Sequence, residues 1–281
     1  MNILEAVILG IIQGISEFLP ISSTGHLTVA GQLMGLISPE NPQHWTAFIA
    51  VIQLGTLISI LIYFWKDIRN IIGDFLKDNL SERKKYADQS ENSKMGWLIV
   101  IGTIPVVIIG LSLKHIIEGE FTKDLYVIAS SLIVLAIVLA IAEKTANFKK
   151  EMKDITIKDS IVIGIAQCFA LIPGSSRSGT TITGGLFVGL TRETAARFSF
   201  LLSIPAVFAS GMLELFESLK YLHGEMTVNL IVSTIVSGVC GYMAIDFLLK
   251  YLRKNTTFLF IYYRIAAGII ILIFLFTHII H

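Results

Sequence analysis

Long apolar runs without charged side chains alternate along the chain with polar connections. A helix needs about 20 residues to cross the hydrocarbon core of a bilayer. Six runs come close to or exceed this length, the last interrupted only by Arg264: Trp45–Trp65, Met95–Leu113, Leu125–Ala142, Phe198–Leu213, Met226–Ile245 and Phe258–Ile280. This pattern predicts six membrane-spanning helices.

Two further apolar stretches, Ile3–Leu36 and Ser160–Leu190, are broken in the middle by proline, serine and glycine. Each is typical of a helix, a break and a second short helix. Non-helical backbone survives at membrane depth only where protein or a wet cavity satisfies its polar groups. We therefore expect an all-α integral membrane protein with two re-entrant helix–loop–helix hairpins besides the six spans.

Composition supports a membrane protein and excludes a soluble one. Of the 281 residues 54% are hydrophobic and 15% are charged, whereas a soluble domain carries about 25% charged residues. The formal net charge is +1, so there is no basic stripe to meet the phosphates of a nucleic acid. Membrane lipid is the expected surrounding, and nucleic acid is not expected as a partner.

Basic residues are concentrated in three connections, at 66–94, 144–158 and 250–254. Cytoplasmic loops carry an excess of Lys and Arg, so these three should lie inside, and both chain ends should lie outside. The polar stretch 78–94 is expected to be a mobile cytoplasmic loop without chemistry. Arg264 is expected to snorkel or pair at the cytoplasmic interface.

The two broken stretches resemble each other. Gly-Ile-x-Gln occurs at 10–13 and at 164–167, and Pro-x-Ser-Ser follows from Pro20 and from Pro173, one residue sooner in the second copy. Three spans follow each copy, and three is odd, so the second copy should be inverted. Inverted repeats with broken helices form sites near the membrane midplane. The predicted halves of a single membrane domain 1–281 are residues 1–143 and 158–281.

The first break combines a carboxylate, hydroxyls and an imidazole. Glu17 is a functional candidate because a charge inside an apolar stretch is costly, and His26 can move protons near neutral pH. Backbone N–H groups at the start of the next helix can bind an anion. Candidate substrate ligands are Gln13, which shares a helix face with Glu17, and Ser22, Thr24 and Gly25. The alternative is a capped kink, with a hydrogen bond between Glu17 and His26.

The second break presents Arg177 between small and hydroxyl-bearing residues. A planar guanidinium can hold a phosphate by two N–H groups, and glycine lets backbone approach a ligand closely. Candidate substrate ligands are Ser176, Ser178, Gly179 and Thr181. Alternatively Arg177 neutralises Glu17 across the two halves. The two interpretations are compatible, because a free site can rest in that ion pair.

Residues 17–26 (Glu-Phe-Leu-Pro-Ile-Ser-Ser-Thr-Gly-His) and 173–179 (Pro-Gly-Ser-Ser-Arg-Ser-Gly) resemble the two motifs of the bacterial undecaprenyl-diphosphatases linked to bacitracin resistance. The resemblance covers essentially the whole chain. It implies a multi-pass enzyme of the cytoplasmic membrane, with its active site toward the outer face. Such an enzyme converts undecaprenyl diphosphate to the monophosphate carrier used for peptidoglycan. The resemblance also implies a divalent cation, Mg²⁺ or Ca²⁺.

The expected catalytic residues are Glu17, Ser23, His26 and Arg177. Ser23 is the expected nucleophile, with His26 as its base and Glu17 orienting His26; direct attack by water is the alternative. The family commonly has Glu where this chain has Gln13, and an amide supplies no anionic metal ligand. Glu17 alone is therefore the expected protein carboxylate for a metal.

A transporter or flippase of an anion or of a polyprenyl phosphate lipid is the rival interpretation, because inverted repeats with broken helices are common in transporters. Proton and nucleophile chemistry at the first break favours the enzyme. The sequence leaves a homodimer open.

Overall fold

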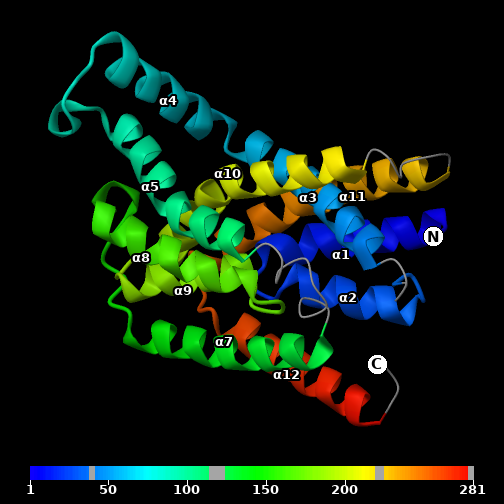
Figure 1. Cartoon of the computed structure of the whole chain (residues 1–281). Helices are drawn as coiled ribbons and strands as arrows, with labels where there is room; N and C mark the ends of the chain where they lie inside the picture. Colours follow the sequence, from blue (N-terminus) through cyan, green and yellow to red (C-terminus); the bar gives the residue numbers. More distant parts are fainter. Residues whose placement is uncertain (38–41, 114–123, 219–224, 278–281) are drawn as a thin grey trace.

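The computed structural model describes residues 1–37, 42–113, 124–218 and 225–277 (Figure 1). Within these ranges the chain is helical and contains no strand. Its α-helices are α1 (Ile3–Phe18), α2 (Ser23–Leu33), α3 (Pro42–Tyr63), α4 (Trp65–Leu76), α5 (Glu91–Ser112), α7 (Leu125–Thr145), α8 (Ile157–Cys168), α9 (Arg177–Phe187), α10 (Arg192–Ser218), α11 (Glu225–Leu252) and α12 (Phe258–Phe276).

The predicted spans are present as long apolar helices. In the described part of the chain α5, α7, α10, α11 and α12 are each long and apolar enough to cross a membrane. The α3 helix meets the same criterion together with α4, from which a 78° bend separates it. The prediction of an all-α membrane protein is confirmed. Of the six predicted spans, five are long apolar helices by themselves, and the bent pair makes up to six.

Each broken stretch folds as two helices joined by a short break. The α1 and α2 helices lie side by side, and so do α8 and α9 (Figure 1). Both breaks point into the interior, where α1 and α9 also contact each other. The placement of these hairpins in a bilayer, and hence their re-entrant character, remains a prediction.

The first helix of each hairpin packs on the other half of the chain. The α1 helix lies along α11, where the Ser233 hydroxyl donates to the carbonyl of Ala6 at 2.7 Å. The α8 helix lies along α5, where the Ser160 hydroxyl donates to the carbonyl of Leu98 at 2.5 Å. This exchange of partners is the packing expected of two inversely related halves.

Glycine allows α1 to approach α11 closely. A Cβ atom added to Gly14 would lie 2.5 Å from the Cβ of Cys240 and 2.6 Å from the carbonyl oxygen of Ser237. A Cβ atom added to Gly10 would lie 2.6 Å from the carbonyl oxygen of Ser233. Two glycines four residues apart are a common means of bringing membrane helices into contact. They fix the position of the helix that carries Glu17.

The polar connection 66–94 is not the loop that the sequence suggested. It contains α4, a π-helical turn (Lys77–Ser81) and the start of α5. The buried carboxylate of Asp78 accepts hydrogen bonds from the backbone N–H of Ser90 at 2.8 Å and from Lys84 Nζ at 2.9 Å. These donors hold the pKa of Asp78 below its usual range. The loop prediction is wrong because polar residues here satisfy one another and build a helical hairpin.

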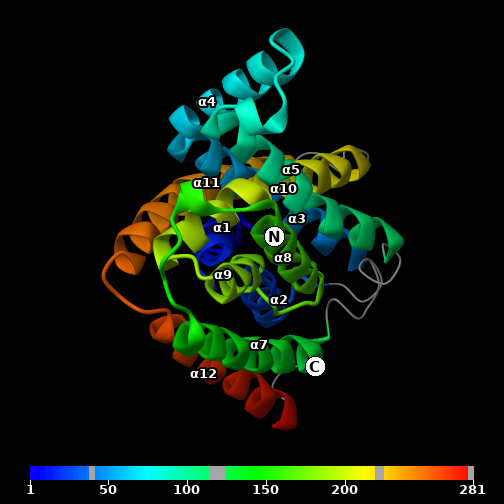
Figure 2. The same cartoon turned by 90° about the vertical axis from the view of Figure 1, so that its left-hand side faces the viewer.

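The three basic connections lie toward one end of the bundle. Figure 2 looks at this end, where the chain passes from α4 to α5, from α7 to α8 and from α11 to α12. The α1 helix begins and α12 ends toward the opposite end (Figure 1). The arrangement agrees with the charge-derived topology, whereas the assignment of the basic end to the cytoplasm remains a prediction.

Candidate active site

The two breaks share an unusual backbone conformation. Ser22 and Ser176 have φ angles of 77° and 67°, a region that costs a residue other than glycine about 1–3 kcal/mol. Each serine is the N-cap of the helix that follows, accepting the N–H of Gly25 at 3.3 Å and of Gly179 at 3.2 Å, respectively. The same strained cap therefore starts α2 and α9.

The N-cap positions show that the alignment of the two repeats on their prolines is shifted by one residue in the breaks. Alignment on the prolines pairs Ser22 with Ser175, whereas the shared cap geometry pairs Ser22 with Ser176. Gln13 and Gln167 then precede their caps by the same separation. In this register Ser23 and Arg177 are equivalent, since each is the first residue of its helix. The two halves thus present a hydroxyl and a guanidinium from the same structural position.

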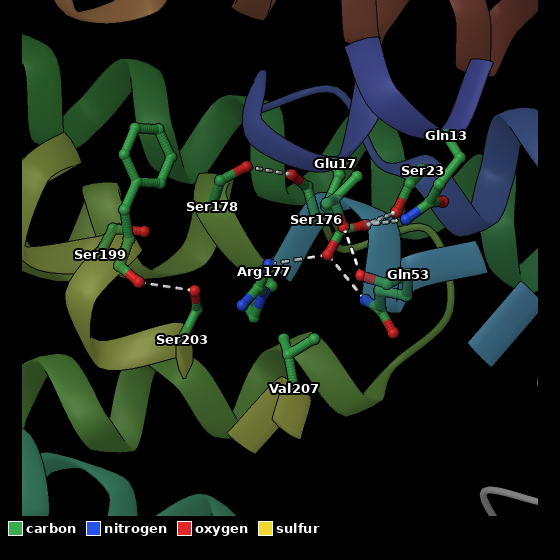
Figure 3. Close-up of polar contacts among 12 residues, drawn as sticks. Gln13, Glu17, Ser23, Gln53, Ser176, Arg177, Ser178, Ser199, Ser203 and Val207 are labelled. Atoms are coloured by element: carbon green, nitrogen blue, oxygen red, sulfur yellow. Dashed lines mark hydrogen bonds and ion pairs between the residues drawn. The ribbon is translucent and has the colours of Figure 1, made fainter. Parts of the chain in front are cut away.

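The carboxylate of Glu17 is buried and accepts four hydrogen bonds (Figure 3). Its Oε1 accepts from Arg177 Nη2 and from Gln53 Nε2, both at 2.7 Å. Its Oε2 accepts from Ser23 Oγ at 2.7 Å and from Gln13 Nε2 at 3.0 Å. Gln13 and Glu17 share one helix face, as predicted, and are hydrogen-bonded. The ion pair between the halves, the alternative considered for Arg177, is present.

Arg177 has donors left over after it pairs with Glu17. Its Nε and Nη1 atoms are buried and have no hydrogen-bond partner among the described residues. Most buried polar groups in proteins are hydrogen-bonded, so unpaired N–H groups on a cation indicate a place for an anion. The guanidinium lies between α3 and α10, near Gln53, Ser203 and Val207 (Figure 3).

The structure does not build the expected chain of Ser23, His26 and Glu17. Ser23 donates directly to Glu17, and within the described part of the chain the imidazole of His26 is hydrogen-bonded to neither of them. His26 Nδ1 lies 2.7 Å from the carbonyl oxygen of Ser22, and Nε2 lies 2.6 Å from the hydroxyl of Tyr263. The proposed hydrogen bond between Glu17 and His26 is therefore wrong for this conformation, because the first turn of α2 directs the imidazole toward α12.

The remaining hydroxyls predicted at the site lie close to the second break. Ser178 Oγ donates to the carbonyl of Leu19 at 3.1 Å and lies 3.2 Å from Ser176 Oγ. Thr181 is buried and donates to the carbonyl of Arg177 at 2.7 Å. The contact of Ser178 with Leu19 ties the two breaks together, and the others lie within the second break. Thr24 lies half-buried on the first turn of α2.

Helices α7 and α12 each donate a hydrogen bond to a backbone carbonyl of the second break. The Ser131 hydroxyl donates to the carbonyl of Pro173, and Arg264 Nη2 donates to the carbonyl of Ser175 at 2.9 Å. Arg264 is fully buried, so the expectation that it snorkels to the interface is wrong. Its guanidinium instead satisfies backbone that the break leaves without a helical partner.

Sequence reasoning did not assign Gln53 and Tyr263 to the site. Gln53 stands in the middle of a span without charged side chains, and that amide at membrane depth was the available signal. Tyr263 carried no such signal, because tyrosine is common near the ends of spans. Tyr263 reaches His26 because of the way α12 is oriented about its own axis.

The first break fits a divalent cation in part. No cluster of three or more His, Cys, Asp or Glu side chains suited to a metal occurs among the described residues. Glu17 supplies one carboxylate, and the buried Oε1 of Gln13 has no hydrogen-bond partner. Carboxylate and amide oxygens are ligands for Mg²⁺ and Ca²⁺, and Mg²⁺ is often held by one or two carboxylates and the phosphates of the substrate. The pair suits a cation that takes its other ligands from a phosphate and water.

Comparison with known proteins places this geometry in a family. The family described as bacitracin resistance protein BacA matches residues 6–270, a stretch that includes both breaks and all the residues around Glu17. The chain belongs to the BacA family. The undecaprenyl-diphosphatase of Syntrophobacter fumaroxidans is 53% identical over 278 residues, covering 99% of each chain.

Two other relatives of this BacA family member support the same assignment. The undecaprenyl-diphosphatase of Chloroherpeton thalassium is 51% identical, covering 97% of this chain and 96% of its own. That of Chlorobaculum tepidum is 49% identical, covering 96% and 95%. The similarity extends over nearly the whole length of each protein, so the BacA fold as a whole is shared.

Proposed function

We propose that this chain is an integral membrane phosphatase that hydrolyses undecaprenyl diphosphate to undecaprenyl phosphate and inorganic phosphate. One observation carries the proposal. The buried carboxylate of Glu17 binds both the hydroxyl of Ser23 and the guanidinium of Arg177, and that guanidinium has N–H groups without a partner among the described residues. Relatives about half identical over their full length carry the matching name. The reaction regenerates the lipid carrier for wall synthesis and accounts for the link of the family to bacitracin resistance.

Arg177 binds the terminal phosphate in this proposal. Its unpaired Nε and Nη1 groups are free to donate to phosphoryl oxygens. The planar fork that suits two such oxygens includes Nη2 and forms once Nη2 leaves Glu17. The phosphate thereby draws away the guanidinium that pairs with Glu17 Oε1 in the free site. Glu17 Oε2 stays hydrogen-bonded to the hydroxyl of Ser23.

Ser23 attacks the terminal phosphorus, and its proton passes to Glu17 Oε2, 2.7 Å away. The bond from phosphorus to the bridging oxygen breaks, and undecaprenyl phosphate leaves. Water then attacks the phosphoserine, returns the hydroxyl to Ser23 and releases inorganic phosphate. In the alternative, water attacks directly and Ser23 only donates to the phosphate.

A divalent cation, Mg²⁺ or Ca²⁺, belongs to the proposal through the family resemblance. Glu17 and the free Oε1 of Gln13 would hold it, and its charge would offset that of the phosphoryl oxygens. We also propose, from the family resemblance, that the site opens to the outer face of the cytoplasmic membrane. The charge pattern puts the chain termini on that face, at the opposite end from the basic connections.

Phosphate release from farnesyl diphosphate, a short polyprenyl diphosphate, tests the function with detergent-purified protein. Arg177→Lys retains the charge and loses the planar fork, so we expect turnover to fall roughly 100-fold, as for the loss of one donor to the transition state. Arg253→Ala is the matched control, because Arg253 is exposed and pairs with Glu193 away from the site.

Absence of release by the wild-type protein contradicts the phosphatase proposal. Normal turnover by Arg177→Lys contradicts only the role of the guanidinium and leaves the phosphatase proposal standing. Thermal unfolding of each variant in detergent separates a lost fold from a lost site.

A further inference from the structure

The α12 helix contributes two consecutive side chains to the breaks. Arg264 holds the carbonyl of Ser175 in the second break at 2.9 Å. Tyr263 reaches the first break, where its hydroxyl lies 2.6 Å from Nε2 of His26. The two rings are stacked, with an interplanar angle of 13° and centroids 5.5 Å apart. A single turn of one helix therefore contacts both halves of the site.

The two neighbours of the imidazole determine where its proton lies. A carbonyl oxygen accepts hydrogen bonds and cannot donate them, so His26 Nδ1, which faces the carbonyl of Ser22, must carry the proton. In the neutral imidazole Nε2 is then the acceptor, and the Tyr263 hydroxyl donates to it. The tautomer and the plane of the ring are both fixed by these two contacts.

Nothing in the packing of α12 requires this contact. Tyr263 is 45% exposed, so its hydroxyl could reach water or a lipid headgroup instead. The preceding Tyr262 is 67% exposed and its ring contacts Phe258 of its own helix. Of the two adjacent tyrosines, one faces outward and the other engages a histidine 237 residues away in sequence.

We propose that Tyr263 is a positioning residue of the active site, which acts through His26 by holding the imidazole in one tautomer with Nε2 as its basic atom. The proposal rests on the proposed function and adds to it that His26, which the sequence marks as a proton carrier, moves protons during hydrolysis. Tyr263 is not a substrate ligand in this proposal. It determines which nitrogen of His26 can accept a proton and in which direction that nitrogen points.

The test compares Tyr263→Phe with Tyr262→Phe. Removal of one hydroxyl leaves the ring contact, so the fold should be retained. For Tyr263→Phe we expect kcat to fall roughly three- to tenfold, the loss of about one hydrogen bond, while KM stays within about twofold because the substrate contacts are unchanged. Tyr262→Phe should match the wild type in both constants.

Nitrogen-15 NMR of histidine-labelled protein gives a readout that does not depend on turnover. The chain has six histidines, and the His26 signals are identified by their loss in His26→Gln. The wild type should show a protonated Nδ1 and a hydrogen-bonded, unprotonated Nε2. In Tyr263→Phe the Nε2 signal should move to the position of an unprotonated nitrogen without a donor, and the Tyr262→Phe signals should not move.

An unchanged Nε2 signal in Tyr263→Phe overturns the proposal, and so does a kcat equal to that of the wild type. A lower thermal midpoint with reduced activity but no NMR change also overturns it, because the role is then structural. If the wild-type protein releases no phosphate, the function fails, whereas the NMR comparison still decides whether Tyr263 holds the ring.

Discussion

At the scale of single residues, Glu17 organises the site. Its carboxylate accepts hydrogen bonds from four helices, through Gln13 on α1, Ser23 on α2, Gln53 on α3 and Arg177 on α9. Removal of one partner of a buried ion pair costs about 3–5 kcal/mol because the other charge stays buried. A phosphate that takes over Arg177 therefore leaves a costly negative charge on Glu17, which the proton received from Ser23 then neutralises.

Ser23→Ala distinguishes the two routes of hydrolysis. If Ser23 is the nucleophile, activity should fall to background and rapid quench of the wild type should trap a phosphoserine at position 23. If water attacks directly, roughly a hundredth of the rate should remain, as for one lost donor, and no phosphoserine should form.

Ser22→Ala is the comparison for this experiment. It removes an N-cap and should lower the stability by about 1 kcal/mol, while most of the turnover remains. Equal losses of activity in both variants would contradict a distinct role for Ser23.

The sequence predicts those contacts of the site that depend on local spacing or on charge. Gln13 and Glu17 are one helical turn apart, and Glu17 and Arg177 are opposite charges that an apolar interior forces together. Gln53 and Tyr263 come from distant spans, and their contacts depend on how each span is rotated about its axis. One sequence contains no signal for that rotation, and the direction of His26 was missed for the same reason.

At the scale of elements, the breaks and the long apolar helices follow from the pattern of apolar and polar residues. Pro, Ser and Gly mark where α1 and α8 end, and charge-free runs mark the spans. The helical structure of the connection 66–94 was not predicted, because low hydropathy is also typical of loops. Its helices depend on contacts between residues far apart in the pattern, such as Asp78 with Ser90.

The close contact of α1 with α11 predicts a strong effect for a small substitution. Gly14→Ala places a Cβ against the backbone of Ser237 and the Cβ of Cys240, so overpacking should cost about 1–3 kcal/mol. Gly73→Ala on α4 has no atom within 4 Å of its new Cβ and should be neutral or stabilising, since alanine favours a helix. Thermal unfolding in detergent measures both, and equal midpoints would contradict the packing.

At the scale of the whole molecule, the basic end of the bundle and the chain termini lie apart, as the charge pattern requires. The sequence also predicts that Gly119 and Gly224 lie in outer loops, and both fall outside the described residues. Asp88 and Thr277 are exposed residues toward the two ends that the structure does describe. They serve to test the orientation in cells.

Cysteines are introduced at these two positions, one at a time, after replacement of Cys168 and Cys240, which are free. A membrane-impermeant thiol reagent applied to intact cells should label position 277 and spare position 88. Permeabilised cells, in which both should react, provide the control. Labelling of position 88 alone would reverse the orientation and move the site to the cytoplasmic face.

The ion pair between the halves also has a consequence for biosynthesis. Glu17 leaves the ribosome 160 residues before Arg177, an interval of about 10–30 seconds at usual rates of translation. During this time Arg177 is not yet present to neutralise the carboxylate, and an unpaired charge in hydrocarbon is costly. Insertion of the first hairpin therefore cannot complete the active site. The first hairpin can reach its final position only after α9 has entered the membrane. The active site therefore forms late, when the second half of the chain is inserted.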